Sequence, residues 1–346
     1  MEFQMLFADT EESIDLRVGH PSEVIFRESM TGVINRIKDA SIFVLDPQAI
    51  EMGVNVFLGK PSSILSALPF VKLPAPSVWI EFSNFASRNA FKNFGNPNPQ
   101  MDNSVIIEKT GFLLSETDGK IKMEMIAQYQ SDQKIKHIEL LSSVCEFDTT
   151  QDFETLPTIF PSIVRDVPDD ATGKAAAYYK MLTNNETEYE AKREIGERFS
   201  GYFHPDIQSA MNKVNSGISD SDKIKFLNGH ISDMERLFTM QILPTLILLN
   251  CRNAVNAEHV PAPEKLNKKR RKKGRPEIKE YNLVKLHLKS RGRKTYETSD
   301  NNGKQTSGGI VIGHFKVRKT GVYWWSPYWR GPTNEQTPRR ISVITN

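Results

Sequence analysis

Apolar residues in the first 82 positions follow helical spacing at first and then gather in short runs. A helical pattern covers residues 21–37, where apolar positions recur every three to four residues. Apolar runs at 42–45 and 78–82 are typical of buried strands. Residues 60–76 lie between these runs and contain four prolines, so we expect an extended connector there.

The clearest strand signal lies between residues 105 and 144. Apolar and charged residues alternate after the pair Asp118-Gly119, and Asp-Gly between alternating arms predicts a β-hairpin. Residues 134–144 add a third strand with similar composition. We therefore expect an antiparallel sheet with one face exposed to solvent in this region.

The period becomes helical from residue 169 to residue 256. We expect helices over 171–182, 186–199 and 222–250, and Pro244 should kink or divide the last of them. The apolar stripe on this last helix is typical of a helix that faces a core. A groove that binds a partner is the alternative interpretation of the same stripe.

The C-terminal part of the chain returns to short strands. Apolar runs predict strands at 281–288, 309–315 and 322–325, and a polar loop separates the first two. The fold class expected is α+β, an antiparallel sheet with helices plus a small basic β-rich C-terminal region. The expected divisions are a mixed α+β body (1–168), a helical segment (169–258), a basic linker (259–280) and a basic, aromatic β-rich region (281–346).

Charge is distributed unevenly along the chain, although the net charge of the 346 residues is only +3. Residues 264–346 carry 21 Lys and Arg against 6 Asp and Glu, a net charge of +15. Residues 1–263 carry 24 against 36, a net charge of −12. An acidic body with a basic end is typical of a protein that binds a polyanion through that end.

The first candidate nucleic-acid contact is a run of basic residues in the expected linker. Such density repels itself unless solvent or a polyanion relieves it, and each phosphate contact releases counterions. A solvated basic linker without a ligand is the alternative. The candidate residues of this run are Lys268, Lys269, Arg270, Arg271, Lys272, Lys273 and Arg275.

The second candidate contact interleaves cations with aromatic rings near the C-terminus. Rings stack on unpaired bases while cations hold the backbone, which favours single-stranded RNA. A buried aromatic core is the alternative, and a strand that alternates faces allows some rings to serve each role. The candidate residues are His314, Lys316, Arg318, Lys319, Tyr323, Trp324, Trp325 and Arg330.

Catalytic and metal chemistry have weaker signals. Cys145 and Cys251 lack metal-ligand spacing, and no phosphate-binding glycine loop or nucleophile elbow occurs, so we expect neither a metal nor a cofactor. His287 and His314 lie in the basic segment, and acid–base cleavage of RNA by these histidines is the enzymatic alternative. The N-terminus lacks a signal-peptide pattern and no apolar stretch reaches membrane-spanning length, so we expect a cytoplasmic protein.

The C-terminal segment resembles a known family. Gly313-His314-Phe315, a basic stretch, Tyr323-Trp324-Trp325-Ser326-Pro327 and Arg330-Gly331 look like the tail of an anti-CRISPR family of phages and mobile elements, the second described group of type V-A inhibitors. The likeness covers about the last third of the chain. Phe315 stands where the family often has Trp, and the basic run is a further departure.

The resemblance implies an antagonist of host defence. Family members are understood to recognise the emerging N-terminal peptide of the CRISPR nuclease and to promote loss of its message. The expected partners are therefore RNA or a ribonucleoprotein, together with a target protein or nascent peptide of a CRISPR nuclease. A phage structural protein that binds nucleic acid is a further alternative.

Overall fold

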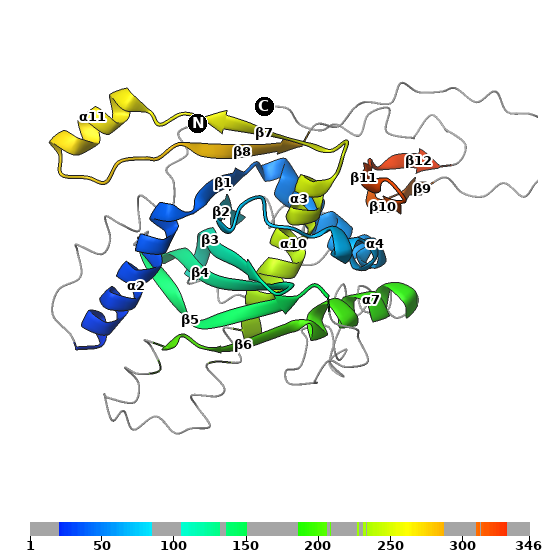
Figure 1. Cartoon of the computed structure of the whole chain (residues 1–346), viewed down its shortest axis with the longest axis horizontal. Coiled ribbons are helices and arrows are strands. Elements are labelled where there is room, and N and C mark those ends of the chain that lie inside the picture. Colours follow the sequence, from blue (N-terminus) through cyan, green and yellow to red (C-terminus); the bar gives the residue numbers. More distant parts are fainter. Residues whose placement is uncertain are drawn as a thin grey trace, which may run out of the picture.

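An eight-stranded mixed sheet forms the centre of the protein in a computed structural model (Figure 1). The strand order is β6-β5-β4-β3-β2-β1-β8-β7, and β1 pairs in parallel with both β2 and β8 while the other pairs are antiparallel. The expected α+β class is confirmed, but the sheet is mixed, not antiparallel throughout. The structure describes residues 21–84, 105–131, 136–150, 186–205, 208, 227, 231–232, 234–286, 309–311 and 313–330.

The strands of the central sheet come from both halves of the sequence. Their bounds are β1 Ser41–Leu45, β2 Ser77–Ser83, β3 Val105–Thr117, β4 Lys120–Ser131, β5 Lys136–Asp148, β6 Phe199–Phe203, β7 Val255–Val260 and β8 Tyr281–Leu286. The predicted hairpin at Asp118-Gly119 is confirmed, since β3 and β4 pair across this turn. Asp118 has φ 51° and Gly119 has φ 74°, the left-handed conformations that a tight hairpin turn requires.

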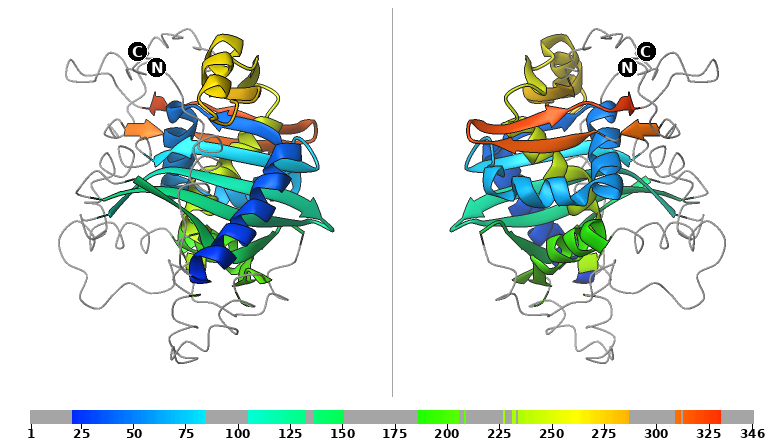
Figure 2. Two further views of the ribbon diagram at one scale, coloured as in Figure 1. Left: turned by 90° about the vertical axis from the view of Figure 1, so that its left-hand side faces the viewer. Right: turned by 90° about the vertical axis from the view of Figure 1, so that its right-hand side faces the viewer.

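Helices cover both faces of the sheet. Helix α2 crosses one face diagonally, as Figure 2 shows in its left view. Helices α3, α4, α7 and α10 lie against the other face, whereas α11 projects beyond the β7–β8 edge of the sheet (Figure 1). Glu124 of β4 is buried on the α2 face, so the expectation of a sheet with one exposed face is wrong. The helical bounds are α2 Pro21–Asp39, α3 Pro47–Gly59, α4 Pro61–Ala67, η1 Leu68–Phe70, α7 Glu186–Glu197, η3 Phe238–Ile242, α10 Leu243–Asn250 and α11 Glu264–Lys272.

Prolines begin helices in the segment that we expected to be an extended connector. Pro61 stands in the first turn of α4 and Pro69 in that of η1, positions where the missing N–H has no helical acceptor to lose. Pro47 does the same in α3, after Asp46 accepts a hydrogen bond from the backbone N–H of Gln48. The prediction for residues 60–76 is therefore wrong over its first half, because proline disfavours helix interiors but not helix starts.

The helix around Pro244 continues through a π-helical turn instead of breaking. The backbone N–H of Leu243 bonds to the carbonyl of Phe238 across η3, and α10 follows directly with Pro244 in its first turn. A π-turn shifts the hydrogen-bond register by one residue, so the helix continues past Pro244 although this residue has no N–H to donate. The expected effect of Pro244 therefore takes the form of a change of helical register.

The C-terminal third is not a separate region in space. Strand β8 lies between β1 and β7 in the central sheet, although we grouped its residues with the basic C-terminal region. Only two small two-stranded sheets follow it among the described residues. These consist of β9 Gly309–Val311 with β12 Tyr328–Arg330, and of β10 His314–Arg318 with β11 Gly321–Trp325.

Some expectations concern residues that the structure does not describe. The helix predicted over 171–182, the polar loop between 291 and 308 and the first turn of the helix predicted from 222 lie outside the described residues. Among the helices described, none combines the length and apolar character needed to cross a membrane.

Candidate nucleic-acid interface

The β10–β11 hairpin separates its side chains into an inner and an outer face. Cross-strand pairing places Phe315 opposite Trp324 and Val317 opposite Val322 on the inner face. Three of these side chains are buried, and Val317, nearest the turn, is 39% exposed. The outer face holds the intervening pairs, His314 with Trp325 and Lys316 with Tyr323, followed by Arg318 beside the turn. The alternation that the sequence left open is therefore resolved by the register.

Trp324 belongs to the core of the protein. Its side chain is 4% exposed, and its ring meets that of Phe315 edge to face with centroids 5.3 Å apart. Both rings join the large apolar cluster beneath α3, α4 and α10. Gly313 makes room for this indole, because a Cβ there would lie 2.5 Å from a ring atom of Trp324. Trp324 is thus placed in the core and not on a base-stacking surface.

The outer face brings rings and cations together. The Lys316 ammonium lies 4.1 Å from the centroid of the Trp325 ring, and His314 packs beside the same ring at 5.9 Å. The Tyr323 hydroxyl is 2.9 Å from that of Thr320. An open hollow of about 570 Å³ is lined by Arg318, Lys319, Thr320, Tyr323 and Trp325. We call this set, with His314 and Lys316, the outer hairpin surface.

The outer hairpin surface carries no acidic side chain. No Asp or Glu occurs between residues 313 and 330, whereas Lys316, Arg318 and Lys319 supply three cations. Arg252 adds a further guanidinium from a distant part of the chain, because its Nε atom lies 3.2 Å from the position that a Cβ of Gly321 would take. Sequence reasoning missed Arg252, since only tertiary packing brings it to the turn.

Three contacts anchor the hairpin to the body. Asn253 accepts a hydrogen bond from the backbone N–H of Trp324 at 2.8 Å and donates one to its carbonyl at 2.9 Å. The backbone N–H of Arg252 donates to the carbonyl of Val322. On the other strand, the N–H of Phe315 donates to the hydroxyl of Ser63 at 3.3 Å. These polar contacts orient the outer hairpin surface, and the sequence carried no signal for them.

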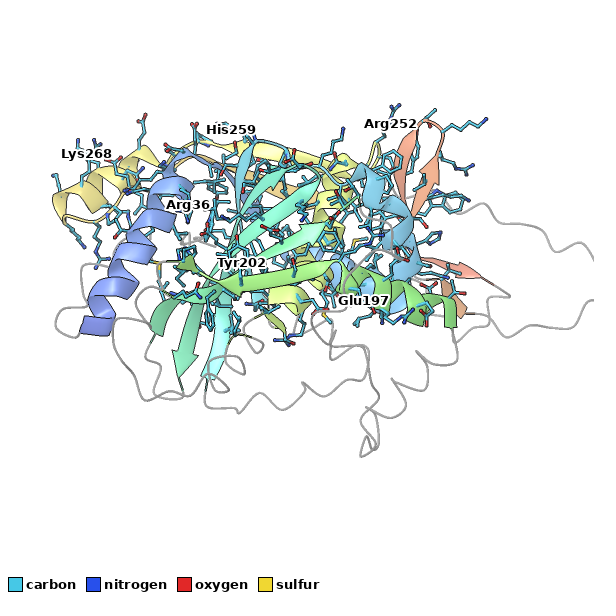
Figure 3. The ribbon with its side chains drawn as sticks, turned by 60° about the horizontal axis from the view of Figure 1, so that its bottom comes forward. Arg36, Glu197, Tyr202, Arg252, His259 and Lys268 are labelled. Carbon is cyan, nitrogen blue, oxygen red and sulfur yellow. The ribbon has the colours of Figure 1, made fainter. Side chains whose placement is uncertain are left out.

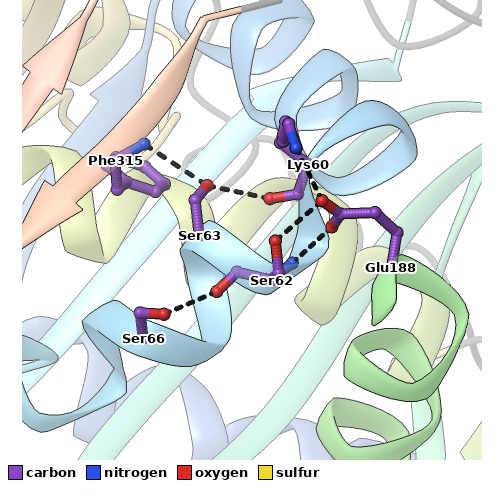
Figure 4. A network of polar contacts seen from close by, with 6 residues as sticks. All are labelled: Lys60, Ser62, Ser63, Ser66, Glu188 and Phe315. Carbon is purple, nitrogen blue, oxygen red and sulfur yellow. Dashed lines mark hydrogen bonds and ion pairs between the residues drawn. The ribbon is translucent and has the colours of Figure 1, made fainter. Parts of the chain in front are cut away.

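A polar network behind Ser63 continues to helix α7 (Figure 4). The Ser63 hydroxyl donates to the carbonyl of Lys60, whose ammonium lies 2.9 Å from Glu188. Glu188 also accepts bonds from the backbone N–H and hydroxyl of Ser62, at the start of α4. Burial alone would raise the pKa of Glu188, but these bonds hold it below its ordinary value. The network is a structural clamp between α4, α7 and the hairpin.

The basic run forms a helix instead of a linker. Lys268–Lys272 lie in α11, which projects at one end of the molecule between β7 and β8 (Figure 1). Gly274 follows with φ 64°, the left-handed conformation common after a helix, and its N–H bonds to the carbonyl of Arg271. Helical hydrogen bonds and tertiary contacts order a segment that we expected to be a basic linker.

Arg270 has a structural role within this helix. Its side chain is only 7% exposed, and its Nε donates to the carbonyl of Pro276. Arg270 therefore holds the returning chain against α11 and is not placed to contact phosphate. The other six predicted residues of the run are exposed: Lys268, Lys269, Arg271, Lys272, Lys273 and Arg275.

A second polar cluster lies under α2, away from the hairpin. Glu124 of β4 accepts hydrogen bonds from Arg36 of α2 at 2.6 Å and lies 3.1 Å from the Nε2 atom of His204. Burial raises the pKa of Glu124, but these two partners outweigh it and hold the pKa below the ordinary value. The cluster fixes α2 and the end of β6 on the sheet.

The described residues include only one of the two histidines of the nuclease alternative. His314 lies on the outer hairpin surface, while His287 and the side chain of Arg330 lie outside the described residues. Within the described ranges, no three His, Cys, Asp or Glu side chains gather as a metal site would need. Cys145 and Cys251 are buried free thiols, and burial raises the pKa of Cys251 to about 12.

Comparison with known proteins assigns no family. No family model, curated protein or solved structure matches this chain. The geometry of the outer hairpin surface and of α11 therefore carries the functional argument.

Proposed function

We propose that the protein is an adaptor that contacts RNA or a ribonucleoprotein through the outer hairpin surface and lowers expression of a target. The observation that carries the RNA contact is the position of the Lys316 ammonium 4.1 Å from the ring of Trp325. The ammonium covers one face of this ring, so a base that stacks on that face displaces the ammonium, which then pairs with the phosphate of the same nucleotide. Tyr323, Arg318 and Lys319 extend this pairing across the hollow.

The charge of the rest of the chain supports binding in one orientation. Residues 1–263 carry a net charge of −12, and this repels a polyanion from the body. The cations gather instead on the hairpin and on α11. An acidic body remains available to contact a protein or peptide while the basic elements hold RNA.

The anti-defence part of the proposal rests on the family resemblance. Of the positions that match the family, His314, Trp324 and Trp325 belong to the hairpin, whereas Arg330 lies in β12. We propose a target of the kind that the resembling family recognises, a CRISPR nuclease or its nascent peptide, and a host cytoplasm as the place of action.

Two tryptophan variants test the RNA contact. We expect Trp325→Ala to weaken binding of labelled oligouridine by about 1–3 kcal/mol with an unchanged melting temperature, because it removes a stacking ring from the surface. Trp324→Ala should instead destabilise the fold by about 3–5 kcal/mol, because it leaves a cavity in the core. Fluorescence anisotropy and thermal unfolding measure the two effects. Full RNA affinity in Trp325→Ala would refute the proposed contact.

The same RNA incubated without added metal distinguishes an adaptor from a nuclease. Binding without cleavage supports the adaptor. Cleavage that is lost in His314→Ala would replace the adaptor by a nuclease, since His314 lies beside Trp325 on the same surface.

The target is approached by pull-down from translating cells that express a CRISPR nuclease. We expect the wild-type protein to retain the nuclease message and the nascent chain. Trp325→Ala serves as the matched variant and should lose the message while its body keeps any protein contact. Retention of the message by this variant at wild-type levels would argue against the hairpin as the RNA contact.

A further inference from the structure

Helix α11 and the chain that returns from it form a folded arm with a fixed shape. Asn267 donates to the carbonyl of Ile278 at 2.7 Å and accepts from its N–H at 2.8 Å, so a side chain pairs with the backbone as a neighbouring strand would. Arg270 and the turn at Gly274 close the other end. The arm, residues 264–279, is therefore held in one conformation.

The exposed surface of this arm is strongly basic. One line of the helix, Asn267 and Arg270, is buried against the returning chain, which leaves the cations on the remaining faces. Glu277 pairs with Arg271 at 3.3 Å, and Glu264 lies at the helix start. The exposed cations are Lys265, Lys268, Lys269, Arg271, Lys272, Lys273 and Arg275.

Strand β7 sets the separation between the arm and the hairpin. Arg252 and Asn253 contact β11 just before β7 begins, and α11 begins at Glu264 just after β7 ends. Six strand residues extend roughly 20 Å, and the eleven-residue path from Asn253 to Glu264 cannot exceed about 40 Å. Figure 3 shows Lys268 on the arm and Arg252 beside the hairpin at opposite ends of the molecule.

We infer that one RNA strand occupies both basic surfaces, with unpaired bases on the outer hairpin surface and phosphates on the α11 arm. At about 3.4 Å per nucleotide, the rise of a helically stacked strand, a separation of 20–40 Å corresponds to roughly 6–12 stacked nucleotides. Two acidic side chains between the two surfaces have basic side chains beside them. Glu258 pairs with Lys285, and Glu280 lies 3.8 Å from His259. This inference rests on the proposed RNA contact and specifies the length of its ligand.

Two contacts on one strand make affinity depend on length. A strand too short to span the gap engages one surface at a time, whereas a longer strand gains from the second contact without a new association step. Substitution of the arm cations should therefore lower the affinity for a long RNA and leave the affinity for a short RNA, which is set by its base contacts, unchanged.

The experiment compares 5-nucleotide and 25-nucleotide oligouridine on the full chain. The arm variant replaces Lys268, Lys269, Lys272 and Lys273 by Gln and leaves the structural Arg270 intact. The control variant replaces the exposed Lys120 and Lys122 of β4 by Gln. Affinity is measured by anisotropy for the long RNA and by competition for the short one, over a series of salt concentrations.

We expect the arm variant to bind the long RNA at least tenfold more weakly. The slope of log affinity against log salt concentration should become shallower by about 3, since four phosphate contacts on a single strand are lost. Its affinity for the short RNA should change less than twofold, and the control variant should change neither. Equal losses on both lengths, or an unchanged slope on the long RNA, would overturn the inference.

Trp325→Ala distinguishes failure of the span from failure of the RNA contact itself. This variant should bind both the short and the long RNA more weakly if the outer hairpin surface binds bases. If it binds the short RNA as the wild type does, the proposed function fails and the inference falls with it. If it loses the short RNA while the arm variant binds the long RNA normally, only the inference fails.

Discussion

Neighbouring residues in the hairpin have opposite roles because a strand alternates its side chains. Trp324 is buried and packs against Phe315, whereas Trp325 lies under the ammonium of Lys316 on the outer surface. The same division separates Arg270 from the lysines beside it in α11. Residue type alone does not distinguish these roles, so single substitutions have to be chosen by face.

Lys192 of α7 is a residue whose charge opposes folding. It is 1% exposed, and its ammonium donates to the carbonyl of Leu58 at 3.1 Å and lies 5.5 Å from the ring centroid of Phe57. Burial lowers the pKa of Lys192 to about 7, and the carboxylate of Glu188 one turn earlier offsets only part of this effect.

We predict that Lys192→Met stabilises the protein at pH 7, because an apolar chain of similar length replaces a group whose charged form is disfavoured by burial. The folded pKa of about 7 lies below the unfolded value of about 10.4. The unfolded chain therefore binds more protons between these values, and wild-type stability should rise from pH 7 to pH 10. Urea unfolding across this range measures both effects.

Lys122→Met, an exposed lysine of β4, is the matched control and should leave the pH slope unchanged. A Lys192→Met protein that is less stable than wild type at pH 7 and keeps the wild-type slope would show that the ammonium contributes to folding.

At the scale of elements, the hairpin depends on a few polar anchors. Among the described strands, β10 and β11 pair only with each other. The Asn253 and Ser63 side chains fix them to the body. The network of Figure 4 connects that anchor to α7 through Glu188. The orientation of the outer hairpin surface is therefore set by side chains in α4 and in the turn before β7.

We predict that Asn253→Ala loosens the hairpin without unfolding the sheet. Two hydrogen bonds to the backbone of Trp324 are lost, at a cost of about 1–3 kcal/mol for groups left buried. Amide hydrogen exchange should show reduced protection of β10 and β11 and unchanged protection of β3 and β4.

Asn250→Ala is a matched control, because the Asn250 side chain makes similar bonds but donates them to the carbonyls of Lys72 and Leu246, which lie outside the hairpin. Protection of the hairpin should be normal in this control. Uniform loss of protection over the whole sheet in Asn253→Ala would contradict the anchoring role.

For the molecule as a whole, the C-terminal third supplies part of the central fold as well as the basic surfaces. Strand β8 pairs on both sides, and Val284 within it is fully buried. Phe315, Val322 and Trp324 close the core over α4 and α10. The acidic part of the chain (1–263) and the basic part (264–346) thus share one core although they are separate in sequence.

We predict that a chain ending at residue 263 fails to fold, because β1 and β7 lose the strand between them. A chain ending at residue 308 keeps β8 and should retain the far-ultraviolet circular dichroism of the central sheet. Its melting temperature should be lower, since it lacks the two small sheets and with them the hairpin rings that close the core. Cooperative unfolding of the shorter chain at the same temperature as the longer one would contradict this division.

The sequence by itself determined most elements of secondary structure, because their signals are local. The Asp118-Gly119 turn, strands β1, β2 and β5, and helices α2 and α7 follow from period, turn chemistry and burial of apolar runs. It also determined the concentration of positive charge near the C-terminus. Each of these properties needs only residues that are close together in the chain.

Only the tertiary structure decided where these elements meet and which side chains remain accessible. The insertion of β8 beside β1 and the approach of Arg252 to the hairpin each join residues far apart in sequence. Arg270 became a structural residue because the chain returns past it, and Trp324 because the hairpin lies on α4 and α10. Packing sets these outcomes, since burial depends on what the rest of the chain places over a residue.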